Sequence, residues 1–196
     1  MAMKREITRD DLLPSTEYAK VRAMRRQTIV ARKQKRRLEV GPVATFHFED
    51  YDSMWLQVQE MLYIEKGGEA QIADELRAYN PLIPKGNELV ATILFEIDDP
   101  VRRKALLGRL GGIEDTAFIR IGTETINGLP EADVDRTSAA GKASAVQFIH
   151  FPFTPTQISK FRQPGAQVIV GFTHQDYAHM AVMPEPVRAT LGDDFD

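Results

Sequence analysis

The chain contains no cysteine, which excludes several classes of chemistry at once. Disulfides, thiol nucleophiles, zinc–thiolate sites and iron–sulfur clusters held by the protein's own thiolates are all ruled out. No apolar run reaches the roughly 20 residues that a membrane-spanning helix needs, and no charged segment followed by an apolar one marks a leader. These absences predict a soluble, cytoplasmic protein without a membrane partner.

Familiar catalytic motifs are also missing. Gly141-Lys142 lacks the earlier glycine and the following Ser or Thr of a phosphate-binding loop. No GxGxxG follows a predicted strand, and there is no GxSxG elbow. Aromatic residues are not interleaved with the basic ones, as they are where single-stranded nucleic acid stacks. The sequence therefore indicates no enzyme of a familiar type.

Positive charge is concentrated near the N-terminus. Residues 1–40 carry twelve Lys and Arg against five Asp and Glu, whereas the whole chain has a net charge of −3. Ser15 can cap a helix that runs to about Arg36, and cations suit the C-terminal end of a helix because of its dipole. Nucleic acid is the less favoured partner; a solvated helical face, or docking on the acidic body of the same chain or of a neighbouring one, as in a homo-oligomer, is preferred. The predicted docking residues are Arg32, Lys33, Arg36 and Arg37.

The pattern of elements predicts an α+β fold. A length of 196 residues and an apolar share of 43% fit one domain with a proper core. Helices and strands do not alternate strictly, which favours a mixed or largely antiparallel sheet with helices packed against it. We expect an N-terminal helical segment (8–37) with a basic helix, a core of sheet and helices (38–175), and an extended C-terminal tail (176–196).

The stretch from Phe46 to Glu65 combines the most apolar helix with an unusual number of polar groups. Polar side chains in an apolar element must find partners or they cost free energy. We therefore predict a buried polar network in this helix. The carboxylates of this network are expected to pair with arginines of the basic helix, namely Arg22, Arg25 or Arg26. The network residues are Gln57, Gln59, Glu60 and Glu65.

A metal site is the alternative for the same region. His47 and Glu49 are two residues apart on a predicted strand, so they share one face. With Glu60 they would form a His–carboxylate set for a divalent ion such as iron, manganese or zinc, although no HxxxH or ExxH spacing supports it. Glu65 is then the candidate catalytic residue, as a proton-transfer group.

Histidines supply the remaining candidates. His174, Tyr177 and His179 follow the last predicted strand, and loops at strand ends often carry sites. Their spacing is unspecific, so surface or capping histidines are the preferred interpretation. His150, between Ile149 and Phe151, is interpreted as a hydrogen-bonded residue of a sheet.

Several long segments resemble one uncharacterised bacterial family, domain of unknown function 3501. The resemblance covers nearly the whole chain, and the segments are FED at 48–50, QVQEML at 57–62, ELRAYNPLIPKG at 75–86, GGIED at 111–115 and GFTHQDY at 171–177. The family brings no established activity. Its members are often encoded beside rubrerythrin-like and iron–sulfur oxidoreductase proteins, which implies an accessory role next to a redox partner. Tyr63 stands where similar proteins tend to have Arg, so no role that needs a cation there is implied.

Three functions follow from these observations. The first is a non-catalytic accessory or binding protein of a redox partner, which would hold any iron–sulfur cluster itself. The second is a metal-dependent oxidoreductase or hydrolase. The third is nucleic-acid binding through residues 20–37.

Overall fold

The computed structural model describes residues 4–131, 137–138 and 141–196. In this part of the chain it has six α-helices and two antiparallel sheets, which confirms the α+β class. None of the described helices has the length and apolar character that a bilayer crossing requires. The α-helices are α1 (Ser15–Gln34), α2 (Tyr51–Glu65), α3 (Gly68–Tyr79), α4 (Pro100–Leu107), α5 (Pro155–Arg162) and α6 (Glu185–Gly192). Short 3₁₀ helices are η1 (Arg9–Asp11), η2 (Asn80–Leu82) and η3 (Ile113–Thr116).

Both sheets are antiparallel throughout their paired strands. The five-stranded sheet has the order β1-β2-β3-β7-β6 and the four-stranded sheet the order β5-β4-β8-β9. The strands are β1 (Arg37–Val40), β2 (Ala44–Phe48), β3 (Glu88–Phe95), β4 (Ala117–Ile121), β5 (Glu124–Asn127), β6 (Leu129–Pro130), β7 (Val146–Pro152), β8 (Val168–Phe172) and β9 (Met180–Val182).

The two sheets pack face to face as a sandwich around one contiguous apolar core. Alternate residues of each strand point into this core, as the two-residue period of a strand requires. In β2 these residues include Phe46, whose ring centroid lies 5.2 Å from that of Phe172 in β8. The core therefore joins strands that are far apart in the sequence.

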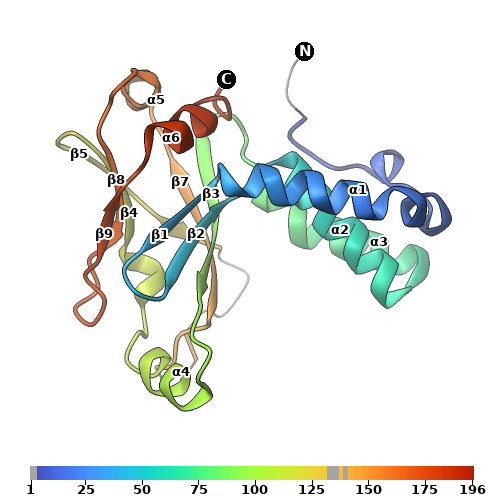
Figure 1. The fold of residues 1–196 in the computed structure, drawn as a ribbon, viewed down its shortest axis with the longest axis horizontal. Helices are drawn as coiled ribbons and strands as arrows, with labels where there is room; N and C mark the ends of the chain where they lie inside the picture. Colours follow the sequence, from blue (N-terminus) through green and yellow to red (C-terminus); the bar gives the residue numbers. More distant parts are fainter. Residues whose placement is uncertain (1–3, 132–136, 139–140) are drawn as a thin grey trace.

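A helical lobe, comprising residues 4–34 and 51–82, projects from the opposite face of the five-stranded sheet (Figure 1). Met54 and Val58 of α2 pack there against Val90 of β3 in a second, smaller apolar cluster. Phe48 points into the sandwich core, so its neighbours His47 and Glu49 point to the opposite face of the sheet, where the lobe lies. The lobe and the sandwich thus have separate apolar clusters on the two faces of one sheet.

The end of α1 and the start of α2 determine which side chains lie at the junction between the lobe and the sandwich. α1 ends at Gln34, before the expected boundary near Arg36, so Arg36 leaves the helix. α2 begins after Asp50, whose carboxylate accepts a hydrogen bond from the Ser53 amide at 2.8 Å. Asp52 and Ser53 lie inside the helix, in its first turn.

The C-terminal segment, expected as an extended tail with one short helix near Val187 to Leu191, contains a strand and a helix. Residues 176–196 form β9 and α6, and α6 lies at one end of the sandwich beside α5 (Figure 1). Val187, Leu191 and Phe195 are buried in the sandwich core. Val187 and Leu191 are four residues apart and share one face of α6, and Phe195 follows the helix.

Candidate functional site

A buried arginine joins the helical lobe to the sandwich. Arg36 is only 2% exposed, and its guanidinium donates hydrogen bonds to the carbonyl groups of Phe48 and Glu49, both at 3.0 Å. It also binds both carboxylate oxygens of Asp194, from the segment after α6. The prediction that Arg36 docks a partner is therefore wrong. Because α1 ends at Gln34, the chain turns this side chain inward.

Two buried carboxylates flank Arg36 and have opposite pKa shifts. Burial raises the pKa of Asp50, but the charge of Arg36, the Ser53 amide and Arg32 outweigh burial, so the net pKa lies below its ordinary value. For Asp194 burial dominates over Arg36, and the pKa is raised. A raised carboxyl pKa is common in catalytic sites. Here, however, both oxygens of Asp194 are bound by Arg36, so the cluster acts as a structural clamp.

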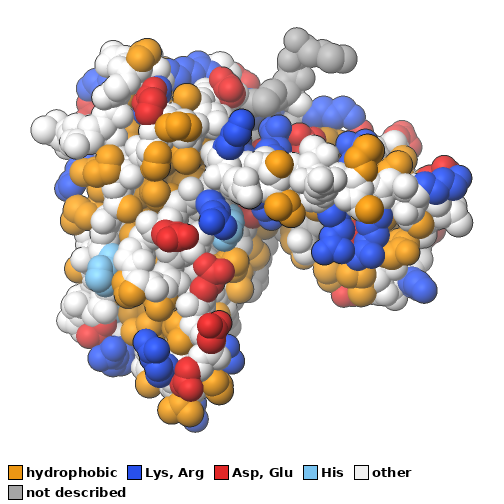
Figure 2. Space-filling view, in the orientation of Figure 1, with side chains coloured by type: hydrophobic (Ala, Val, Ile, Leu, Met, Phe, Trp, Pro, Cys, Tyr) orange, Lys and Arg blue, Asp and Glu red, His pale blue; other side chains and the backbone are white. Residues whose placement is uncertain are grey.

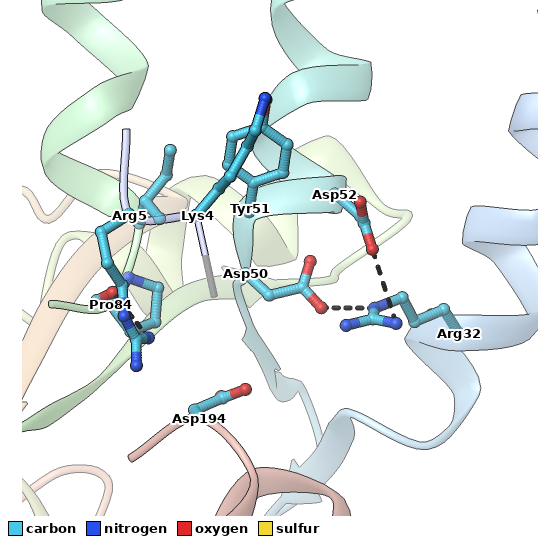
Figure 3. Close-up of a pocket in the computed structure, with 9 residues that line it drawn as sticks. Lys4, Arg5, Arg32, Asp50, Tyr51, Asp52, Pro84 and Asp194 are labelled. Carbon is cyan, nitrogen blue, oxygen red and sulfur yellow. Dashed lines mark hydrogen bonds and ion pairs between the residues drawn. The ribbon is translucent and has the colours of Figure 1, made fainter. Parts of the chain in front are cut away.

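A cavity of about 290 Å³ lies beside this clamp (Figure 3). Figure 3 shows Arg32 reaching Asp50 and Asp52 at its edge. Lys4 pairs with Asp11, and Arg5 pairs with Asp196 and donates to the Pro84 carbonyl at 3.1 Å. The charged groups around the cavity thus neutralise one another, and its volume is at the lower end of the roughly 300–1,000 Å³ of typical ligand sites. The cavity wall therefore offers little unpaired charge to a substrate.

The predicted metal ligands are not brought together. Glu49 is buried and accepts hydrogen bonds from Ser53 at 2.6 Å and Thr92 at 2.7 Å. Nε2 of His47 is buried without a hydrogen-bond partner among the described residues, and burial lowers the pKa of this histidine. Within residues 4–131, 137–138 and 141–196, no three His, Asp or Glu side chains are grouped to hold a metal ion.

Glu60 forms the arginine pair that the sequence favours. Its two oxygens accept hydrogen bonds from Nε and Nη2 of Arg22, both at 2.8 Å, and Tyr18 donates its hydroxyl at 2.6 Å. These bonds, those from Arg22 above all, lower the pKa of Glu60 to about 2. Arg22 also lies over the ring of Tyr63 at 4.9 Å. Glu60 is thus a structural anion between α1 and α2.

The other polar groups of α2 have separate partners and do not form one network. The Gln59 side chain accepts from the amide of Leu13 at 2.7 Å and donates to its carbonyl at 3.3 Å. Gln57 donates to the hydroxyl of Tyr79 at 3.3 Å. Glu65 is exposed and accepts from Gln71, so its expected place in the interior is wrong. It is the last residue of α2, where the helix leaves the lobe's apolar cluster.

The cluster of His174, Tyr177 and His179 has a clear structural role. The Tyr177 hydroxyl donates to the Val40 carbonyl at 2.9 Å and accepts from the backbone amides after β1. The His179 ring lies 4.5 Å from the Tyr177 ring and against Gly41, where a Cβ atom would approach it to 2.6 Å. His174 instead contacts the carbonyl of Gly111 at 3.2 Å. Tyr177 and His179 thus fasten the β1–β2 turn to the four-stranded sheet.

His150 is hydrogen-bonded in the sheet, as the sequence predicts, but its two partners were not foreseen. Nδ1 lies 3.0 Å from Glu88 and Nε2 lies 2.8 Å from Glu131. Burial lowers the pKa of His150, but the bonds and charges of the two carboxylates outweigh it and raise the pKa above its ordinary value. Glu88 lies on the adjacent strand β3, so the register between β3 and β7 is the information that would have been needed to predict its contact with His150.

The four predicted docking cations have different surroundings. Arg36 is buried, and Arg32 forms ion pairs with Asp50 and Asp52. Lys33 is half-buried and Arg37 is exposed, and neither forms an ion pair with a described residue. Only these two retain free positive charge for a partner.

Comparison with known proteins gives a family and a solved structure. A family model described as "Protein of unknown function (DUF3501)" matches residues 6–195. A crystal structure of a novel protein of unknown function from Burkholderia pseudomallei is similar, with 36% sequence identity and a TM-score of 0.89. The alignment covers 97% of this chain and 99% of that one. No curated protein matches the sequence.

Proposed function

The chain belongs to the DUF3501 family, and we propose that it is a non-catalytic accessory protein that binds an acidic protein through one face of its helical lobe. The observation that carries this proposal is a set of unpaired cations. Most other basic residues of α1 are neutralised internally, for example Arg22 by Glu60 and Arg32 by Asp50. The charge that remains is available to a partner.

These unpaired cations lie on one face. Arg26, Val30 and Lys33 are spaced i, i+4 and i+7 along α1, so they share one side of the helix. Val30 is 62% exposed, and Arg37 follows at the start of β1. The positive charges of Lys33 and Arg37 both lower the pKa of His47. Both residues therefore lie near His47, at the corner between the lobe and the sheet. We call Arg26, Val30, Lys33 and Arg37 the basic face.

The basic face has the composition of a docking surface for an acidic protein. An exposed apolar side chain among cations combines contact area with electrostatic complementarity. Figure 2 shows Lys and Arg side chains gathered over the helical lobe, whereas over the sandwich Asp and Glu side chains lie among Lys and Arg. A partner with a negative surface would therefore be attracted less by the mixed charge of the sandwich than by the lobe.

The chemistry would reside in the partner. The carboxylates at the junction are engaged in ion pairs or hydrogen bonds, as described for Asp194, Glu49 and Glu60. The chain has no cysteine to hold an iron–sulfur cluster. The resemblance implies a rubrerythrin-like or iron–sulfur protein, and these are the partners to test first.

The test is a binding titration with purified rubrerythrin-like and iron–sulfur proteins from the same source. The triple variant Arg26→Glu, Lys33→Glu, Arg37→Glu should weaken the affinity about tenfold or more, because like charges would face each other. The matched control reverses three exposed cations at the far end of the sandwich, in and after α4, and should leave the affinity unchanged. Its changes are Arg102→Glu, Lys104→Glu and Arg109→Glu.

Three outcomes would overturn the proposal. The first is that neither candidate protein binds. The second is that both triple variants weaken binding equally, which would show that binding depends only on the net charge of the chain. The third is that the basic face is needed for salt-sensitive retention on DNA and heparin but not for binding to protein. Circular dichroism of each variant confirms that the fold is intact.

A further inference from the structure

We propose that an apolar groove in the helical lobe binds a straight-chain alkyl carboxylate, the chemistry of a fatty acid. The groove has a volume of about 730 Å³ and lies between the segment after η1, the start of α1, and the turn from α2 to α3. Small-molecule sites typically measure about 300–1,000 Å³. The site is separate from the basic face and from the cavity beside Arg36.

The groove wall suits an alkyl chain. Its apolar lining comes from both sides of the lobe, and several of these side chains belong to the lobe's apolar cluster. A chain of methylene groups laid along them would be removed from water, which is the main source of affinity in such sites. The apolar lining residues are Leu12, Leu13, Ala19, Leu62, Tyr63 and Ile72.

The charge at the groove suits a single negative head group. Arg9 and Glu69 line it and form a bidentate ion pair with each other, so together they are neutral. Lys66 also lines it and forms no ion pair with a described residue. Lys66 is the residue that ends α2, with a left-handed backbone conformation (φ +56°), so its Cα is held at the end of the helix beside the groove. A ligand with one apolar chain and one carboxylate would therefore place its chain in the groove and its carboxylate beside Lys66.

Polar groups beside the cation add hydrogen-bonding capacity. Ser15 and Thr16, at the start of α1, line the same groove, and their hydroxyls bond to no other described residue. A hydroxyl can donate to a carboxylate oxygen. A neutral alcohol or ester of the same length would gain the apolar contact but not the charge of Lys66.

Calorimetry of the full chain, freed of bound lipid, tests the apolar part of the proposal with octanoate, decanoate and dodecanoate below their micelle concentrations. The affinity should rise about fourfold for each added methylene that the groove covers, with one ligand per chain. Dodecanol should bind about tenfold more weakly than dodecanoate, since it lacks the charge. Absence of saturable binding for all three acids would overturn the proposal.

Variants test the site itself. Ala19→Trp should fill the groove and abolish dodecanoate binding, whereas Ala31→Trp, at an exposed position of the same helix outside the groove, should not. Lys66→Gln should weaken dodecanoate about tenfold and leave dodecanol unchanged. Binding that survives Ala19→Trp, or equal weakening of both ligands by Lys66→Gln, would contradict the assignment. Thermal melts confirm that each variant is folded.

Discussion

The sandwich and the helical lobe are stabilised in different ways. In the sandwich, a large apolar core joins two sheets, and aromatic rings such as Phe46 and Phe172 meet across it. In the lobe the apolar cluster is small, and polar groups make many of the long-range connections. Trp55, for example, donates its indole NH to the carbonyl of Asp11 at 2.8 Å. Apolar contact holds the sandwich, while directional bonds orient the lobe.

This difference predicts different responses to mutation. Apolar packing is non-directional, so a core can partly collapse around a smaller side chain. A buried hydrogen-bonded or charged group has no such substitute, because its partners remain unpaired when it is removed. The position of the lobe should therefore depend on a few polar residues.

The largest expected effect is at Arg36. Arg36→Met would leave Asp194 as an uncompensated buried charge and Asp50 with Arg32 as its remaining arginine partner, and we expect a loss of about 3–5 kcal/mol in the free energy of unfolding. Urea denaturation measures this. Arg32→Met should cost about 1 kcal/mol or less, because Arg32 is 44% exposed.

A second variant separates the charge from the shape of this site. In Arg36→Met with Asp194→Leu, one stranded carboxylate is removed, so much of the stability should return. Wild-type stability of Arg36→Met alone would show that the clamp does not hold the lobe.

An intermediate effect is expected at Gln59, which fastens the segment before α1. Gln59→Leu leaves the half-buried amide and carbonyl of Leu13 unpaired and should cost about 1–3 kcal/mol. Hydrogen exchange should speed up at Leu13 while amides of β3 stay protected. Gln57→Leu, which loses only a 3.3 Å contact with Tyr79, is the control and should have a smaller effect. Equal acceleration in β3 would contradict a local role.

The smallest effect concerns His150 and its two carboxylate partners in the sandwich. Because the pKa of His150 is raised in the folded chain, its ion pairs add stability below its ordinary value of 6.5, and this contribution is lost as the pH rises through the folded pKa. The stability difference between wild type and His150→Gln should thus be larger near about pH 5.5 than near about pH 8. Denaturation at both pH values measures it. A difference that does not change with pH would be inconsistent with this role.

The sequence predicts the features that depend on local pattern. The α+β class and the antiparallel sheets follow from the alternation of apolar residues. A cap residue followed by proline at the first helical position marks the starts of α4, at Asp99-Pro100, and of α5, at Thr154-Pro155. The pairing of Glu60 with an arginine of the basic helix also follows, because a carboxylate in an apolar helix needs a partner.

The clamp could not be predicted in the same way. Arg36 and Asp194 are 158 residues apart in the sequence, and no local pattern relates them. Moreover, a difference of two residues in the end of α1 decides whether Arg36 points to solvent or to the interior. Glu65 was expected in the interior with the apolar residues of its helix, but it is the last residue of α2 and is exposed.

The distance along the chain between Arg36 and Asp194 also bears on biosynthesis. A ribosome releases the N-terminal part first, so α1, α2 and the β1–β2 hairpin emerge well before the carboxylate that neutralises Arg36. Until then Arg36 has its early partners, the Phe48 and Glu49 carbonyls and Asp50, but lacks the carboxylate of Asp194. The contact that ties the end of the first helix to the C-terminal segment is therefore among the last to form.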